Sequence, residues 1–236
     1  MTLSTAVPTR DNAALHRRGA AVALAGSALL VGVASIVAPA NSGTPEELYR
    51  LGTESAGRMT AEAYLLTASS VLLVFGVLGA ARLVTDRGRI AARVAAVLGV
   101  MGALGHLAYS VFSMITLALV DSELERGDVL TGLDAVDASA GVGLLVVPLI
   151  LAYALSVLVL PIALYRGRLV PLWVVGVAAA AVLVEVVGGT GPVGYLKYLL
   201  ALAATTAIAV RILRLDDEQW RDPRLLTPAD RPTASR

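Results

Sequence analysis

The 236-residue chain is 57% hydrophobic and only 16% charged, with a formal net charge of +1 and no cysteine, whereas soluble domains average about 45–50% apolar and about 25% charged residues. The lack of cysteine excludes disulfides, thiolate metal sites and thiol redox chemistry. The two histidines, His16 and His106, lie far apart in the chain, so we expect no metal and no cofactor, and the near-zero net charge predicts no nucleic-acid partner.

The chain contains a series of long apolar runs, separated by short polar segments: residues 19–40, 61–84, 90–120, 138–164, 169–187 and 193–213. A helix rises 1.5 Å per residue, so a run of about 18 residues or more can cross a hydrocarbon core of about 30 Å. The sequence therefore predicts an all-α integral membrane bundle of six transmembrane helices (19–213) in the lipid bilayer. A cytoplasmic N-terminal segment (1–18) precedes the bundle, and a mobile cytoplasmic tail (214–236) follows it.

The first run follows the basic residues Arg17 and Arg18, a pattern that signal peptides share. Signal peptides have an apolar core of about 7–15 residues, and this run is longer. We therefore interpret it as a retained first helix. Polar loops are predicted at residues 41–60 and 121–137, the second of them strongly acidic.

Small residues and a proline mark the third and fourth predicted helices. Gly99, Gly102 and Gly105 recur at every third position, a spacing that allows close approach of a neighbouring helix. Pro148 falls inside the fourth helix, where it removes one backbone hydrogen bond and predicts a kink.

Arginines are distributed unevenly among the connecting segments. Fifteen lie in the terminal segments and the second and fourth connections or within four residues of them, three lie in the first and third connections, and Lys197 falls within a predicted span. Since basic residues accumulate on the cytoplasmic side, we predict that both termini are cytoplasmic and that the protein resides in the plasma membrane.

A few ionisable residues fall inside the apolar runs, where they are costly and commonly functional. Four predicted helices each supply one such group to the outer half of the bundle, and two tyrosines lie at similar depth: Glu62, His106, Tyr109, Tyr153, Glu185 and Lys197. Facing inward, these six would line one outward-facing polar pocket. Structural alternatives are hydrated helix-end acids, a Lys197 ion pair with Glu185 or Glu62, and a histidine bonded to a carbonyl or a tyrosine.

Three functions fit this pattern. The first is binding or transport of a small lipophilic or cationic ligand through the pocket. The second is an intramembrane enzyme that uses acid–base chemistry on an isoprenoid or lipid, like terpene cyclases, although no motif of theirs occurs. The third is an accessory or immunity-type membrane subunit. A homo-oligomer is compatible with each of them.

One ten-residue segment, 164–173, reads Leu-Tyr-Arg-Gly-Arg-Leu-Val-Pro-Leu-Trp. It resembles the Y-R-x-R-L-V-P-x-W-like turn between helices four and five of an uncharacterised family of actinobacterial multi-pass membrane proteins. The resemblance implies a six-helix architecture and carries over no functional residue. In physical terms the segment is a basic turn with a proline at a helix start and a tryptophan at the membrane interface.

Overall fold

The computed structural model describes residues 12–40, 43–187 and 192–226, and these residues are helical with no strand among them. Six long helices are present: α1 (Ala13–Val37), α3 (Ala56–Ala81), α4 (Arg89–Val120), α6 (Ala140–Arg166), α7 (Leu172–Val187) and α8 (Leu196–Leu213). By length and composition, α1, α3, α4, α8 and the Pro148–Arg166 part of α6 can cross a membrane, whereas α7 is a shorter apolar helix of 16 residues. The all-α prediction is confirmed.

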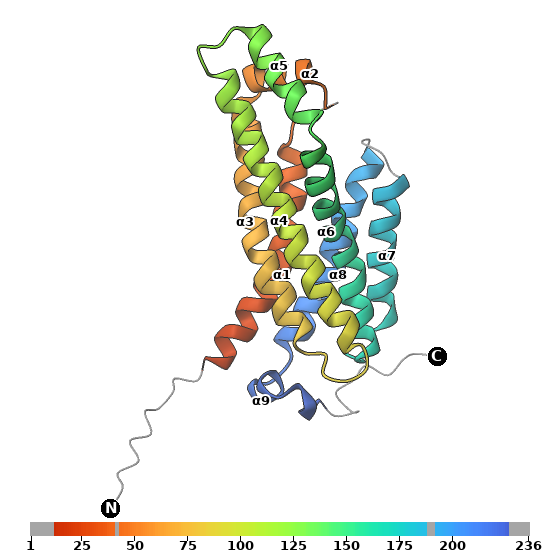
Figure 1. Cartoon of the computed structure of the whole chain (residues 1–236). Helices are drawn as coiled ribbons and strands as arrows, with labels where there is room; N and C mark the ends of the chain where they lie inside the picture. The colour runs from red at the N-terminus through yellow and green to blue at the C-terminus, as the bar shows by residue number, and fades with distance from the viewer. Residues whose placement is uncertain (1–11, 41–42, 188–191, 227–236) are drawn as a thin grey trace, which may run out of the picture.

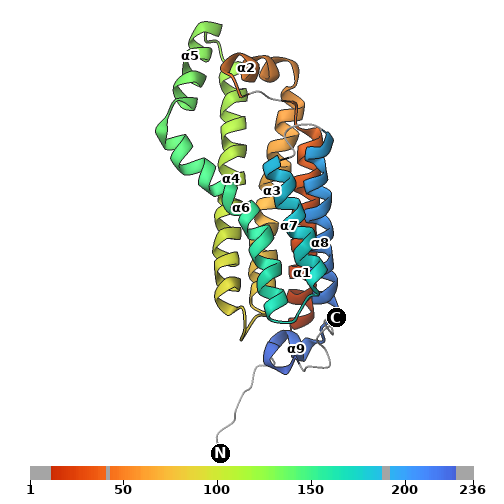
Figure 2. The same ribbon diagram turned by 90° about the vertical axis from the view of Figure 1, so that its right-hand side faces the viewer.

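The long helices form a closed ring. Each packs against the next in chain order, and α8 returns to α1 (Figures 1 and 2). Because successive long helices run in opposite directions, α1 begins at the same end of the ring at which α8 finishes (Figure 1). The connections between α3 and α4 and between α6 and α7 lie at that end too.

Glycines bring α4 and α6 close together. A Cβ added to Gly102 would lie 2.6 Å from the Cα of Tyr153, and one added to Gly105 would lie 2.8 Å from the carbonyl carbon of Leu149. Real Cβ atoms do not approach backbone atoms so closely. The two helices can therefore pack at this distance only because glycine has no side chain. The packing role predicted for these glycines is confirmed.

The outer face of the ring is apolar, and its interior is built largely from small residues. Many buried core residues are alanine, and the buried hydroxyl of Ser69 on α3 donates a 2.9 Å hydrogen bond to the carbonyl oxygen of Ser27 on α1. Large apolar side chains point outward instead, among them Val22, Leu29, Phe75, Leu104 and Leu183. Small residues at helix contacts and large apolar residues outside are typical of membrane bundles.

Two short helices cover the end of the ring opposite to the start of α1. Helices α2 (Pro45–Glu54) and α5 (Arg126–Asp137) occupy segments that we predicted as polar loops, so that prediction is wrong for both segments. The Thr44 side chain accepts a hydrogen bond from a backbone N–H in the first turn of α2, which caps the helix. Leu48 then packs against Val129 and Leu133 of α5, and this small apolar contact holds both helices.

At the other end, part of the C-terminal segment packs onto the bundle. Helix α9 (Asp217–Arg221) buries Trp220 to 2% exposure. The Arg82 guanidinium lies 4.6 Å from the centre of the Trp220 ring and donates a 2.9 Å hydrogen bond to the backbone carbonyl oxygen of Trp220. In addition, Arg17 forms an ion pair with Asp217 at 3.0 Å. We predicted a mobile tail from residue 214, but the chain packs against the bundle as far as Leu226.

Helix boundaries depart from the prediction mainly where polar residues continue a helix. Helix α1 begins at Ala13, six residues before its apolar run, and α3 begins at Ala56 rather than at residue 61. Pro148 lies inside α6, as does Pro161. Figure 2 shows the first part of α6 running obliquely to the rest of the helix. Such a change of direction is expected of a helix that is kinked at a proline.

Candidate functional site

A cavity of about 130 Å³ lies between α4, α6, α7 and α8. Most of its lining is aliphatic, and five side chains add polar or aromatic groups: His106, Tyr153, Glu185, Lys197 and Tyr198. Four of the six predicted pocket residues therefore meet at one cavity. It lies nearer the end of the bundle at which α7 finishes and α8 begins, because Glu185 belongs to the last turn of α7 and Lys197 to the first turn of α8.

An ion pair forms one side of the cavity. Lys197 Nζ on α8 lies 2.6 Å from Glu185 Oε2 on α7, and the two side chains are 19% and 48% exposed. The same ammonium lies 4.9 Å from the centre of the Tyr198 ring, a distance at which a cation is attracted to an aromatic face. Antiparallel packing of α7 and α8 brings the two charges together, as one of the structural alternatives expected. The sequence between the two charges contains Gly188, Gly189, Gly191 and Gly194 and predicts a glycine-rich turn, which falls largely outside the described residues.

His106 and Tyr153 form the deeper part of the site. Their ring centres are 4.6 Å apart with the planes tilted by 50°, and His106 is only 8% exposed. The His106 Nδ1 atom is buried without a hydrogen-bond partner among the described residues. Buried polar atoms are generally satisfied, so this unpaired nitrogen is an exception in a residue that lines the cavity.

Glu62 and Tyr109 lie beside this cavity and do not line it. The Glu62 carboxyl group on α3 faces the Tyr109 hydroxyl on α4, close enough for the two side chains to interact. Tyr109, Tyr153 and Tyr198 all pack against one small apolar cluster, made by Val31, Ala34 and Leu66. The six predicted residues are therefore neighbours, divided between a cavity and a separate acid–tyrosine pair.

Tyr198, which is not among the six residues predicted from the sequence, contributes its ring to the cavity. Its position directly after Lys197 is no signal for the site, because adjacent residues on a helix point about 100° apart. Among the described residues, no group of three or more histidine, aspartate or glutamate side chains is placed to hold a metal ion.

The arrangement already holds one cation, because the Lys197 ammonium lies against a carboxylate and a tyrosine ring. A carboxylate, two tyrosine rings and an aliphatic wall can bind an ammonium and the apolar body attached to it. The volume of about 130 Å³ is slightly below that of an engineered apolar cavity of about 150 Å³ that holds benzene. A ligand of roughly that size would fill it. No protein-family model, curated protein or solved structure matches this chain.

Proposed function

We propose that the chain spans the plasma membrane six times, with α7 as one of the spans and both termini in the cytoplasm. Helix α7 has 16 residues, or about 24 Å at 1.5 Å per residue, and a bilayer adjusts to a span a few ångströms short. It also packs between α6 and α8 as a member of the ring. The arginines of the α3–α4 and α6–α7 connections lie at the end where α1 begins, as expected for the cytoplasmic side.

Because the chain has no cysteine, single introduced cysteines can report this topology. Gly127→Cys places a thiol on α5, where a Cβ meets open space, and Glu218→Cys places one on the exposed part of α9. In intact cells, a membrane-impermeant maleimide should label Gly127→Cys and should reach Glu218→Cys only after permeabilisation. Labelling of both before permeabilisation would contradict the topology.

We further propose that the cavity between α4, α6, α7 and α8 binds a small lipophilic ammonium compound. The observation that carries the proposal is the Lys197–Glu185 pair on the wall of a cavity that is otherwise aromatic and aliphatic. The lysine ammonium already occupies the position that a ligand cation would take, next to a carboxylate and near a tyrosine face. A ligand ammonium would displace it and place its apolar body in the cavity, against Tyr153.

Benzylammonium and benzyl alcohol test this proposal, because they share an aromatic body and differ in charge. Titrations of the detergent-purified protein should show saturable binding of benzylammonium and at least tenfold weaker binding of the alcohol, since only the cation gains the carboxylate and the aromatic faces. Equal binding of both compounds would show that the cavity binds the aromatic body alone, without a contribution from the ammonium charge. No saturable binding of benzylammonium would remove the proposal.

A further inference from the structure

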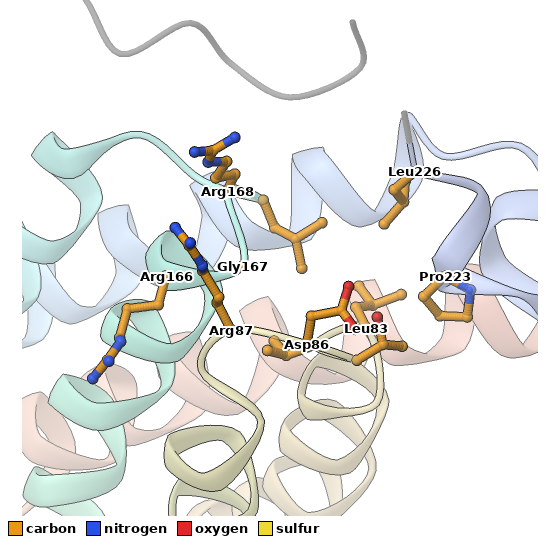
Figure 3. A pocket seen from close by; sticks show the side chains of 11 residues that line it. Leu83, Asp86, Arg87, Arg166, Gly167, Arg168, Pro223 and Leu226 are labelled. Carbon is orange, nitrogen blue, oxygen red and sulfur yellow. The ribbon is translucent and has the colours of Figure 1, made fainter. Parts of the chain in front are cut away.

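A second and larger pocket lies at the opposite end of the bundle, where α1 begins. It has a volume of about 280 Å³ and lies between the α3–α4 connection, the α6–α7 connection and the segment that follows α9 (Figure 3). Its charged lining consists of Arg87, Arg166 and Arg168 against a single acid, Asp86. No hydrogen bond or ion pair of these three guanidinium groups is seen within the described part of the chain. They are therefore free to bind an anion.

The two connections that form the pocket are fixed against each other. Gly88, directly before α4, has φ +95°, and a Cβ there would lie 2.7 Å from the carbonyl oxygen of Ala163 on α6. A residue with a side chain would be strained by its backbone angle and would also collide with α6. Leu83, Val84 and Leu169 are buried beneath the pocket. The arginines thus extend from rigid backbone.

Arg168 occupies a position that normally belongs to glycine. The end of α6 is a Schellman motif, in which the Leu169 N–H donates to the Leu164 carbonyl at 2.8 Å and the Arg168 N–H donates to the Tyr165 carbonyl at 2.8 Å. Arg168 therefore adopts a left-handed φ of 59°, while the glycine of this turn, Gly167, lies one position earlier in a right-handed conformation. The left-handed conformation is uncommon for a residue other than glycine, and such conformations cluster at binding and active sites.

We propose that this pocket binds a phosphate group, carried either by an anionic phospholipid headgroup or by a small soluble phosphate. The lining has two positive charges in excess, and planar guanidinium groups donate paired hydrogen bonds to phosphate oxygens. The volume of about 280 Å³ equals about nine water molecules at ~30 Å³ each, enough for a headgroup and too small for a whole lipid. Basic pockets at the cytoplasmic ends of transmembrane helices are suited to such headgroups.

The guanidinium groups do not contribute equally. Figure 3 shows Arg166 extending away from Arg87 and Arg168, so the phosphate contacts fall chiefly to the latter two. Asp86 opposes them, because its carboxylate lines the same pocket and repels an anion. Removal of the acid and removal of the arginines should therefore change the affinity in opposite directions. The proposal is independent of the cation cavity, which lies at the other end of the bundle.

The test uses the full chain in phosphatidylcholine nanodiscs, with dioctanoyl phosphatidylglycerol and inorganic phosphate as separate probes. The double variant R87Q/R168Q should bind the preferred probe at least tenfold more weakly than the natural chain. R89Q/R93Q, which removes two nearby arginines outside the pocket lining, should change the affinity less than threefold, and Asp86→Asn should tighten binding. Saturable binding of the lipid alone identifies a headgroup site, and binding of inorganic phosphate identifies a soluble ligand; either result supports the pocket.

Arg168→Gly separates binding from folding. Glycine relieves the left-handed strain, so the melting temperature should stay the same or rise while affinity for the probe falls at least threefold. A loss of affinity shared equally by R87Q/R168Q and R89Q/R93Q would reveal only a general charge effect and would overturn the proposal. The absence of saturable binding of either probe would overturn it too.

Discussion

Substitution of Gly102 by alanine is expected to destabilise the bundle by about 1–3 kcal/mol, the usual cost of forcing extra atoms into a packed interface. The added methyl group would lie 2.6 Å from the Tyr153 Cα and 2.8 Å from its backbone nitrogen. Backbone cannot rotate away as a side chain can, so α4 and α6 must separate. Tyr153 also lines the ligand cavity, and benzylammonium binding should weaken in the same variant.

Gly176→Ala is the matched control, because a Cβ at Gly176 on α7 meets nothing within 4 Å. Alanine there should leave stability unchanged or raise it by up to about 1 kcal/mol, since glycine is a poor helix former. The melting of both variants can be followed by size-exclusion chromatography after heating in detergent. Equal stabilities for the two variants would show that the α4–α6 contact is not as close as described.

Glu185→Gln and Lys197→Met are expected to change benzylammonium affinity in opposite directions. Glutamine removes the charge that holds the ligand cation, and a hydrogen bond to a charged group contributes about 1.5–3 kcal/mol, so affinity should fall about tenfold or more. Methionine keeps most of the lysine stem and removes the ammonium that lies 2.6 Å from Glu185. Without this internal competitor the ligand should bind several-fold more tightly.

Glu54→Gln serves as the control for a general charge effect. Glu54 is an exposed acid on α2, paired with Arg50 and remote from the cavity, and its loss should leave affinity within about twofold. Isothermal titration of the four proteins gives the comparison directly. Weaker binding in Lys197→Met would mean that the lysine contacts the ligand instead of competing with it, and the displacement mechanism would be wrong.

Hydrophobic run length and small-residue spacing were sufficient to predict the helical architecture. The runs located all six long helices, and the spacing of Gly102 and Gly105 identified a true interface. Helices α2 and α5 were missed because they are short and mostly polar, and their apolar residues are paired only after folding, when Leu48 meets Leu133. Periodicity within one short segment carries too little of that information.

The candidate site was predictable where a residue type is unusual for its depth. A lysine and a glutamate inside apolar runs stood out, and they proved to be paired. Tyr198 did not stand out, since tyrosine is common in membrane proteins, and its role follows only from the position of the Lys197 ammonium. The basic pocket could not be predicted from the sequence either, because arginines in the connecting segments indicate topology and Arg168 is distinctive only through its backbone angle.

Ligand protection of a single cysteine tests most directly whether a small cation enters the cavity between α4, α6, α7 and α8. Ala154 on α6 lines the cavity, so Ala154→Cys places a thiol inside it in a chain that has no other cysteine. Benzylammonium should slow the reaction of this thiol with a small methanethiosulfonate reagent, with half-protection at the concentration that half-saturates binding, and should leave Gly127→Cys unaffected. An unchanged rate for Ala154→Cys at saturating benzylammonium would place the ligand elsewhere and contradict the proposed site.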